Sequence, residues 1–317
     1  MAEAFIQANH LKKYFKTPRG MLHAVDDVTL SIPKGKTLGI VGESGCGKST
    51  LGRLMLNLLE PTSGEMLLDG QNIYTLRSSQ MKKMRTRAQM IFQDPYSSLN
   101  PRMSVSEIIA EPIIANDLIK NRQDIQKRVE ELMDTVGLAQ RFINAYPHEL
   151  DGGRRQRIGV ARALAVNPEF IVCDEPVSAL DVSIQAQILN LMMDLQDELG
   201  LTYVFITHDL SVVKHISDEI AVMYLGQCVE RVPSKELFQN PLHPYTKALL
   251  SAIPIPDLST RGRKRQILTG EVKSPIEPKP GCRFAARCPN ATAACAEHVC
   301  NLKEVEPNHF VSCVLYE

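Results

Sequence analysis

Residues 42–50 constrain the fold of this chain more than any other segment. Their sequence, GESGCGKST, fits the pattern G-x-x-x-x-G-K-[ST] and follows a strand-like run, TLGIV. The glycines let the backbone curl tightly, so that successive N–H groups point inward at phosphate oxygens. Lys48 would then reach the β- and γ-phosphates of a nucleotide, and the Ser49 hydroxyl would ligate Mg²⁺. The surrounding pattern favours a phosphate loop over an ordinary glycine-rich turn.

An apolar stripe follows this loop at helical spacing. It consists of Leu51, Leu54, Met55, Leu58 and Leu59. The spacing predicts a helix that begins near residue 48 and buries this face. The N-terminal end of such a helix adds positive potential where phosphates would bind.

Composition excludes several classes of protein. The 317 residues contain 36 Lys plus Arg and 36 Asp plus Glu, so no overall basic field indicates a nucleic-acid partner. No apolar run is long enough to span a bilayer, and the start of the sequence, MAEAFIQANH, lacks a signal-peptide core. We therefore expect a cytosolic protein that reaches a membrane only through partners. In that compartment, its eight cysteines are better explained as metal ligands or buried thiols than as disulfides.

The pattern of elements predicts an α/β fold. Residues 1–35 are β-rich, and residues 65–69 form another short strand. A helical stretch follows at about 97–165. Residues 170–173 and 203–207 are continuous apolar runs, typical of central parallel strands, and helical segments separate them. After about residue 255 the composition changes to a proline-rich stretch with a basic run, RGRKR, which we interpret as a solvated linker.

A second acidic element supports the phosphate-loop interpretation. Phosphoryl transfer needs carboxylates that hold Mg²⁺ and direct water. Asp174 and Glu175 follow the apolar run 170–173, at the expected end of a strand. Asp174 would hold Mg²⁺, and Glu175 would polarise the attacking water. A histidine, His208, follows the next apolar run. A lone histidine is often a buried residue at a strand end, but its position within this set of motifs favours a functional role.

The ordered set of motifs resembles the ATP-binding-cassette (ABC) ATPases over most of residues 5–250. The matching blocks are the phosphate loop, Phe92-Gln93-Asp94-Pro95, a signature-like block at 150–157, the Asp174-Glu175 strand, the SALD loop ending in Asp181, and His208. The resemblance implies a phosphate-loop NTPase core with a parallel sheet, an N-terminal antiparallel β subdomain and a helical subdomain. It also implies a head-to-tail dimer in which each ATP site uses both subunits.

The resemblance implies a role for each matching residue. Glu175, His208 and Gln93 would be catalytic, and Ser49, Gln93 and Asp174 would hold Mg²⁺. Asp181 would lie at the subunit interface, near the partner's phosphate loop. Tyr14 would stack on adenine, although the adjacent Phe15 leaves this assignment open. The remaining nucleotide-binding residues would be Gly42, Ser44, Gly45, Cys46, Gly47, Lys48, Thr50, Asp151, Gly152 and Gly153.

Asp151 departs from the family pattern Leu-Ser-Gly-Gly-Gln. In this chain the block is Leu-Asp-Gly-Gly-Arg, so an aspartate would face the γ-phosphate bound to the partner. Two unit charges about 4 Å apart interact by roughly 4 kcal/mol at an effective dielectric of 20. Aspartate is nevertheless as good an N-cap as serine, and Arg154 supplies a nearby positive charge. Two interpretations stay open: a compensated pair, or an ATP site that hydrolyses slowly.

The C-terminal stretch indicates which group of ABC ATPases the chain resembles. The run NPLHPYTKALL at 240–250 and the cysteine-rich tail resemble ATPase subunits of oligopeptide and dipeptide importers and their nickel-importing relatives, and the second of two paralogous subunits in particular. All-thiolate ligation suits a 4Fe–4S cluster, and the resemblance indicates Cys282, Cys288, Cys295 and Cys313 as its ligands. Zinc and free thiols are the alternatives, since His298 and His309 lie nearby.

These observations predict an ATPase domain at 1–255 and a small Cys-rich C-terminal domain at 256–317. The chain would hydrolyse ATP to power uptake of di- and oligopeptides, at the cytoplasmic face of the membrane. Its expected partners are a paralogous ATPase, two membrane permeases and, indirectly, an extracytoplasmic binding protein. The alternatives are import of nickel or another small solute, a soluble ABC-type ATPase, and a redox-sensing regulatory subunit.

Overall fold

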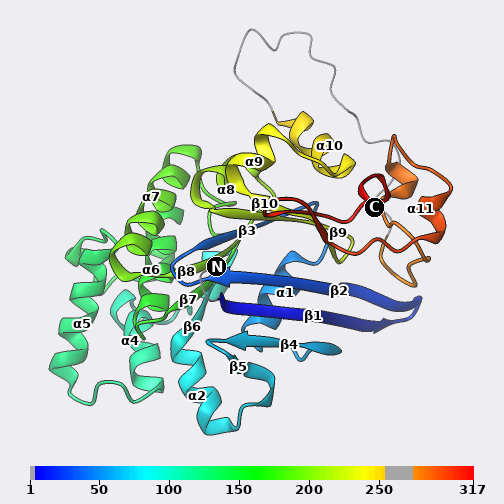
Figure 1. The fold of residues 1–317 in the computed structure, drawn as a ribbon. Helices are drawn as coiled ribbons and strands as arrows, with labels where there is room; N and C mark the ends of the chain where they lie inside the picture. Colours follow the sequence, from blue (N-terminus) through cyan, green and yellow to red (C-terminus); the bar gives the residue numbers. More distant parts are fainter. Residues whose placement is uncertain (1–3, 254–273) are drawn as a thin grey trace, which may run out of the picture.

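The computed structural model describes residues 4–253 and 274–317, and its core contains two sheets (Figure 1). The smaller sheet is antiparallel, with the order β2-β1-β4-β5. It consists of β1 (Ala4–Thr17), β2 (Gly20–Pro33), β4 (Ser63–Leu68) and β5 (Gln71–Asn72). The predicted N-terminal antiparallel β region is therefore present.

The larger sheet has eight strands in the order β11-β12-β10-β9-β3-β8-β7-β6. Five consecutive strands, from β9 to the edge strand β6, are parallel, as predicted for an α/β fold. They are β3 (Thr37–Val41), β6 (Ala88–Ile91), β7 (Phe170–Asp174), β8 (Thr202–Ile206) and β9 (Glu219–Tyr224). Every residue of β3, β7 and β8 is buried. Continuous burial explains why these strands have unbroken apolar sequences, because helices or the smaller sheet cover both faces.

Six helices accompany this core. They are α1 (Lys48–Met55), α2 (Ser78–Arg87), α7 (Val182–Leu199), α8 (Leu210–Ile216), α9 (Ser234–Gln239) and α10 (Pro244–Ala252). The helix after the phosphate loop is shorter than predicted. It ends at Met55, and Asn57 has a left-handed φ of 51°. Leu58 is consequently half exposed instead of completing the buried stripe.

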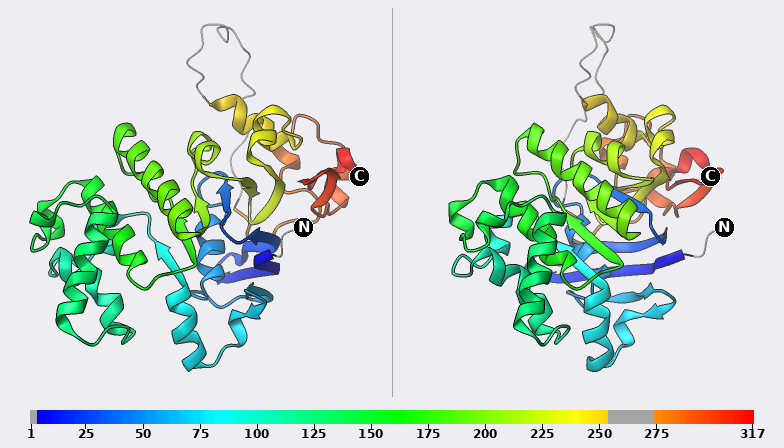
Figure 2. Two further views of the ribbon diagram at one scale, coloured as in Figure 1. Left: turned by 60° about the vertical axis from the view of Figure 1, so that its left-hand side comes forward. Right: turned by 90° about the vertical axis from the view of Figure 1, so that its left-hand side faces the viewer.

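The predicted helical stretch extends away from the sheets (Figure 2). It contains α3 (Pro95–Ser98), α4 (Val105–Ala115), α5 (Arg122–Thr135) and α6 (Gly152–Leu164). Local capping explains where α4 begins. The Ser104 hydroxyl accepts a hydrogen bond from the Glu107 backbone N–H, and the Glu107 carboxylate accepts one from the Ser104 backbone N–H. Short 3-10 turns lie at Ile73–Thr75, Gln140–Phe142, Pro147–Glu149, Ala285–Arg287 and Val314–Tyr316.

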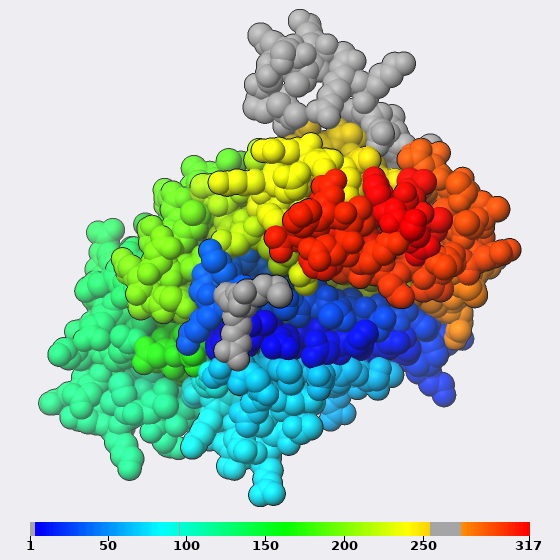
Figure 3. Space-filling view, viewed as in Figure 1, coloured from blue at the N-terminus to red at the C-terminus, as the bar shows by residue number. Residues whose placement is uncertain are grey.

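The C-terminal residues join the main sheet rather than forming a sheet of their own. β12 (His309–Val311) pairs with β10 (Gln227–Pro233), and β11 (Lys303–Glu306) pairs with β12. A short helix, α11 (Ala294–Glu297), precedes them, and Figure 3 shows this tail packed against the remainder of the chain. The separate Cys-rich domain that we expected is therefore not confirmed. The predicted boundary at 255/256 and the basic run lie outside the described residues.

A buried carboxylate on β10 holds these C-terminal elements against the main sheet through hydrogen bonds. Glu230 on β10 is fully buried and accepts hydrogen bonds from the backbone N–H groups of Leu242 and His243. The His309 ring lies 2.8 Å from the same carboxylate. Since breaking a buried polar network is costly, this cluster fixes both α10 and β12 onto the sheet.

The same cluster predicts loss of stability in mild acid. Burial lowers the pKa of His243 from 6.5 to about 4, and its Nδ1 accepts the Tyr245 N–H that caps α10. Between pH 6.5 and pH 4 the unfolded chain therefore binds a proton that the folded chain excludes. We expect stability to fall as pH falls through this window, by on the order of 3 kcal/mol at most.

The measurement is the thermal midpoint between pH 7 and pH 4.5, compared with that of His243→Asn. Asparagine can cap the helix but does not titrate in this range. We expect the variant to lose part of the pH dependence. An identical pH profile for both proteins would contradict the assignment to His243.

Candidate nucleotide site

Four predicted site segments meet because each follows the carboxyl end of a parallel strand. The phosphate loop follows β3, Gln93 follows β6, Glu175 follows β7 and His208 follows β8. These strands are neighbours in the order β3-β8-β7-β6. In open parallel sheets, ligands bind at this edge. The topology therefore gathers residues from Gly42 to His208 at one edge of the sheet.

The phosphate loop has the tight backbone that its glycines predict. Gly47 has φ 105°, and a β-carbon there would lie 2.0 Å from the carbonyl oxygen of Ala24, so no larger residue fits. Lys48 is 5% exposed, and its ammonium donates to the carbonyl oxygens of Gly42 at 2.8 Å and Glu43 at 3.0 Å. The loop thus holds a buried cation at the N-terminal end of α1, where an anion is favoured.

A pocket of about 280 Å³ opens over this loop. Six predicted nucleotide-binding residues line it, namely Ser44, Gly45, Gly47, Lys48, Ser49 and Thr50, together with the catalytic candidates Gln93 and Glu175. The rest of the lining consists of Phe15, Leu22, Ala24 and Pro275. Cys46 differs from its neighbours because its side chain is buried in the core, so only its backbone can serve a ligand. Gly42 contributes the carbonyl that holds Lys48.

Ser49 and Asp174 form a pair of oxygen ligands suited to Mg²⁺. The Ser49 hydroxyl donates to the Asp174 carboxylate at 2.7 Å. Burial raises the pKa of Asp174 above its ordinary value, while the hydrogen bond from Ser49 opposes that shift. Mg²⁺ is usually held by one or two carboxylates together with substrate phosphates, and these residues fit that pattern. Bound there, the ion would neutralise charge on the phosphates.

Glu175 lies at the centre of the catalytic candidates. Its carboxylate accepts a hydrogen bond from the Gln93 side chain at 3.0 Å, and the His208 Nδ1 lies 3.2 Å from the same oxygen. The Glu175 backbone has a left-handed φ of 46°, which costs a non-glycine residue about 1–2 kcal/mol. The surrounding contacts therefore hold this carboxylate in one place. Such an arrangement can orient and deprotonate a water molecule.

Phe15, and not Tyr14, lies at the pocket. The Tyr14 ring stacks on His23 with centroids 3.9 Å apart, and its hydroxyl donates to Asp26. Tyr14 does not line this pocket, and its hydroxyl and one face of its ring are engaged by Asp26 and His23. The Phe15 ring lines the pocket, with the Lys13 ammonium 5.1 Å from its centroid. An aromatic platform is present, one residue later than predicted.

The structure confirms that Asp151 caps α6. Its carboxylate accepts the Arg154 backbone N–H at 2.8 Å and the Arg154 guanidinium at 2.5 Å. The predicted compensation between these two residues is therefore present. Arg141 and Arg157 line the same hollow, which adds further positive charge around the aspartate.

Comparison with known proteins identifies this chain. Residues 25–178 match the family model described as ABC transporter, and residues 229–295 match "Oligopeptide/dipeptide transporter, C-terminal region". The chain is 52% identical to the oligopeptide transport ATP-binding protein AppF of Bacillus subtilis, over 99% of this chain and 98% of the relative. The chain belongs to the ABC transporter family. This ABC protein is accordingly an ATPase.

Further comparisons agree with that assignment. The ABC protein is also 52% identical to OppF of Salmonella typhimurium, over 96% of this chain and 91% of the relative. A dimeric ATP-binding cassette, MJ0796 bound to ADP and Pi, superimposes with a TM-score of 0.67 at 30% identity, covering 72% of this chain and 98% of that one. CbiO1 of Clostridium perfringens, part of the transporter complex cbiONQ, has a TM-score of 0.67 at 28% identity and covers 75% and 92%.

The described part of the ABC protein contains no helix long and apolar enough to cross a bilayer. The match to the oligopeptide/dipeptide transporter C-terminal region and to oligopeptide transport ATP-binding proteins implies membrane permease subunits as partners of this ATP-binding subunit. Its surface carries a groove of about 630 Å³ lined from α2, β6 and α4. Leu58 and Phe92 line this groove and are 50% and 39% exposed. Phe92, which lines the groove, directly precedes Gln93, which lines the nucleotide pocket.

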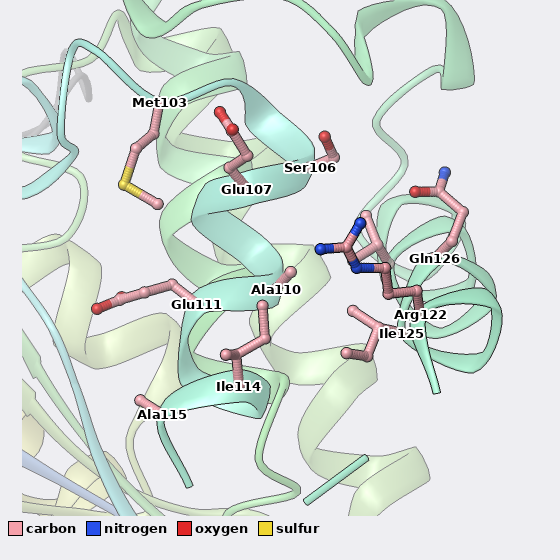
Figure 4. Close-up of a pocket in the computed structure, with 11 residues that line it drawn as sticks. Met103, Ser106, Glu107, Ala110, Glu111, Ile114, Ala115, Arg122, Ile125 and Gln126 are labelled. Carbon is pink, nitrogen blue, oxygen red and sulfur yellow. The ribbon is translucent and has the colours of Figure 1, made fainter. Parts of the chain in front are cut away.

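A second hollow lies within the helical region of the ABC protein. It has a volume of about 520 Å³ and is lined mainly by α4 and α5, with Glu107 and Glu111 on one helix and Arg122 on the other (Figure 4). None of the predicted catalytic or nucleotide-binding residues lines it. It is therefore not part of the nucleotide site.

The cysteine prediction is not supported. Among residues 4–253 and 274–317, no three His, Cys, Asp or Glu side chains are arranged to hold a metal ion. The four candidates do lie in one region, because Cys282 interacts electrostatically with Cys288, Cys295 and Cys313, and its backbone N–H donates to the Cys295 carbonyl at 2.8 Å. Burial raises the pKa of the Cys282, Cys288 and Cys313 thiols, which disfavours the thiolate that metals bind. Cys46, Cys173 and Cys228 are buried, as expected, whereas Cys300 is partly exposed.

Proposed function

We propose that this ATPase powers the uptake of di- and oligopeptides through a membrane importer. The observation that carries the proposal is the match of residues 229–295 to the oligopeptide/dipeptide transporter C-terminal region, together with the named function of relatives about 52% identical. Residues 256–317 would form its transporter-type C-terminal unit. The protein would work at the cytoplasmic face of the membrane and receive cargo indirectly from an extracytoplasmic binding protein.

Each ATP site would be shared between this chain and a paralogous ATPase subunit. Within the chain, the phosphate loop and the Asp151 block line separate hollows, and no residue is common to both. In a head-to-tail dimer, the partner's signature would cover the phosphate loop of this chain. The Asp151-Gly152-Gly153 segment would cover the partner's loop, with Asp181 nearby. A solved cassette of similar fold is dimeric.

Hydrolysis would proceed through the residues gathered at the strand ends. Lys48 would bind the β- and γ-phosphates, and the Ser49 hydroxyl and Asp174 would hold Mg²⁺. Glu175 would take a proton from the attacking water, because its carboxylate faces the pocket and is held by two neighbours. His208 would contact the γ-phosphate. Gln93 would detect the nucleotide and transmit its state toward the groove beside Phe92.

That groove predicts where the permease binds. Single exposed apolar side chains are common, but apolar side chains exposed together mark interaction sites, and Leu58 and Phe92 lie together in one hollow. We expect Phe92→Ser to lower co-purification with the permease subunits several-fold, while nucleotide binding by the free chain is unchanged. Leu199→Ser is the matched control, because Leu199 is 55% exposed at the end of α7. Equal loss of co-purification in both variants would contradict this location.

The transport function is tested by purifying the chain from membranes with its co-expressed permeases. We expect ATP hydrolysis by the assembly to rise when a peptide-loaded binding protein is added. Stimulation only by a binding protein that is loaded with nickel would indicate that nickel is the cargo. A chain that is recovered only with soluble partners would support the non-transport ATPase and overturn the proposal.

Asp151 predicts that the ATP site completed by this signature hydrolyses slowly. The carboxylate would face a triphosphate, and Arg154 offsets only part of the repulsion. We expect Asp151→Ser to raise turnover at that site by about tenfold, which corresponds to removing roughly 1.4 kcal/mol. The measurement is the ATPase rate of the assembled complex. An unchanged rate, with turnover at the partner's site demonstrated, would contradict the prediction.

We also propose, from cysteine spacing and family resemblance alone, that Cys282, Cys288, Cys295 and Cys313 can carry a 4Fe–4S cluster after local rearrangement. Anaerobically purified protein is expected to absorb broadly in the blue part of the visible spectrum. Colourless protein with bound zinc would favour the zinc alternative. Colourless protein without metal would show that these residues are free thiols, and would exclude the redox-sensing role.

A further inference from the structure

The segment between Cys282 and Cys288 directs two arginines at the ATPase core. The Arg287 guanidinium binds the Glu43 carboxylate through two hydrogen bonds of 2.8 and 3.0 Å. The Arg283 guanidinium pairs with Asp26 on β2 and also donates to the Leu225 carbonyl. Both arginine side chains are only 8% exposed. Paired, fork-like contacts of this kind are among the strongest polar interactions in proteins.

Glu43 is the second residue of the phosphate loop. Its carbonyl accepts a hydrogen bond from the Lys48 ammonium at 3.0 Å, and its backbone N–H donates to the Tyr245 hydroxyl at 3.0 Å. The side chain of Glu43 is bound by Arg287, as described above. Contacts from α10 and from the tail therefore converge on the residue whose carbonyl positions the phosphate-binding lysine.

The negative charge of Glu43 links its contact with Arg287 to nucleotide binding. A carboxylate in a loop that binds a triphosphate repels the ligand unless a cation neutralises it. Arg287 supplies that cation, and the hydrogen bond to Glu43 raises the pKa of the guanidinium further above its ordinary value. Among the described residues, no other Lys, Arg or His forms an ion pair with Glu43.

We propose that Arg287 is a positioning residue of the ATP site: it neutralises Glu43 and fixes the phosphate loop, so that the C-terminal tail sets nucleotide affinity within the same chain. The proposal rests on ATP binding at the phosphate loop and goes beyond the transport function. The segment between Cys282 and Cys288 thus acts on the phosphate loop without a bound metal.

The test uses the full chain and its affinity for a non-hydrolysable ATP analogue with Mg²⁺. We expect Arg287→Ala to raise Kd about tenfold, and to raise KM for ATP in the assembled complex while kcat at saturation changes less than twofold. In the double variant Arg287→Ala with Glu43→Gln, the charge that repels phosphate is gone, so Kd is expected to return to within about twofold of the wild-type value. If Arg287→Ala does not fold, Arg287→Lys is expected to show a smaller rise in Kd, because it keeps the charge but loses the fork.

Arg231→Ala is the matched control. Arg231 pairs with Glu219 at 3.0 Å and is similarly shielded, but the pair lies on β10 and β9 and does not contact the phosphate loop. It is expected to lose thermal stability without a change in Kd. A wild-type Kd in folded Arg287→Ala, or an undiminished defect in the double variant, would overturn the inference. Absence of nucleotide binding by the wild-type chain would overturn it together with the ATPase function.

Discussion

Replacement of Glu175 with glutamine is expected to lower ATP hydrolysis by about 10²- to 10⁴-fold, the usual contribution of a general base. The amide keeps the size of the side chain and can remain beside Gln93 and His208, but it cannot accept a proton from water. Nucleotide binding is expected to persist, because Lys48 and Ser49 are unchanged. The measurement is phosphate release by the assembled complex, with the partner's site inactivated, alongside direct binding of ATP.

Glu198→Gln provides the control for this experiment. Glu198 is an exposed carboxylate near the end of α7, away from the nucleotide pocket. Its removal is expected to leave the rate within twofold of the wild type. Hydrolysis at a near-wild-type rate by Glu175→Gln would show that another group activates the water.

Replacement of Lys48 with alanine is expected to weaken ATP binding by on the order of 100-fold. Each hydrogen bond to a charged group contributes about 1.5–3 kcal/mol, and this ammonium would form such bonds to two phosphates. In the free protein the ammonium also donates hydrogen bonds to the carbonyls of Gly42 and Glu43, so the substitution removes these bonds within the loop as well. The variant should therefore fail at binding, whereas Glu175→Gln should fail only at turnover.

Equilibrium binding of a fluorescent nucleotide measures this effect. Lys34→Ala is the control, because Lys34 forms an exposed ion pair with Glu169. Exposed pairs contribute at most about 1 kcal/mol to stability, so its affinity should match the wild type. Unchanged affinity in Lys48→Ala would show that the nucleotide binds elsewhere.

The phosphate loop and the catalytic candidates could be predicted because their chemistry follows short, contiguous patterns. A glycine-rich loop after an apolar strand has few alternatives. Glu175 and His208 each follow a buried run, and strand ends of a parallel sheet meet at one edge. The sequence therefore predicts their convergence, although not the shared contact on one carboxylate oxygen.

Tyr14 lies outside the pocket lining for a reason that a sequence pattern does not show. Side chains alternate between the two faces of a strand, but the pairing of β1 with β2 shifts register between Lys13 and Tyr14. After such an irregularity, simple alternation no longer predicts which aromatic faces the pocket. Phe15 is the next residue, and the strand geometry determines that Phe15, and not Tyr14, lines the pocket.

Arg287 was missed because its function depends on a contact between distant parts of the chain. It lies 244 residues from Glu43, and no local motif joins them. The cysteines on either side, Cys282 and Cys288, are in sequence more typical of metal binding. The fold instead shows the arginines of this segment pointing into the ATPase core, where they meet carboxylates of β2 and the phosphate loop.

ATP-driven peptide uptake into proteoliposomes tests the central claim most directly. The vesicles would contain this chain, its paralogue and both permeases, with ATP sealed on the side where the ATPases lie and a loaded binding protein on the other. We predict uptake of a labelled oligopeptide that requires ATP and is abolished when Glu175→Gln replaces the wild-type chain. Uptake that is unaffected by this variant, or transport of nickel but not of peptide, would contradict the account.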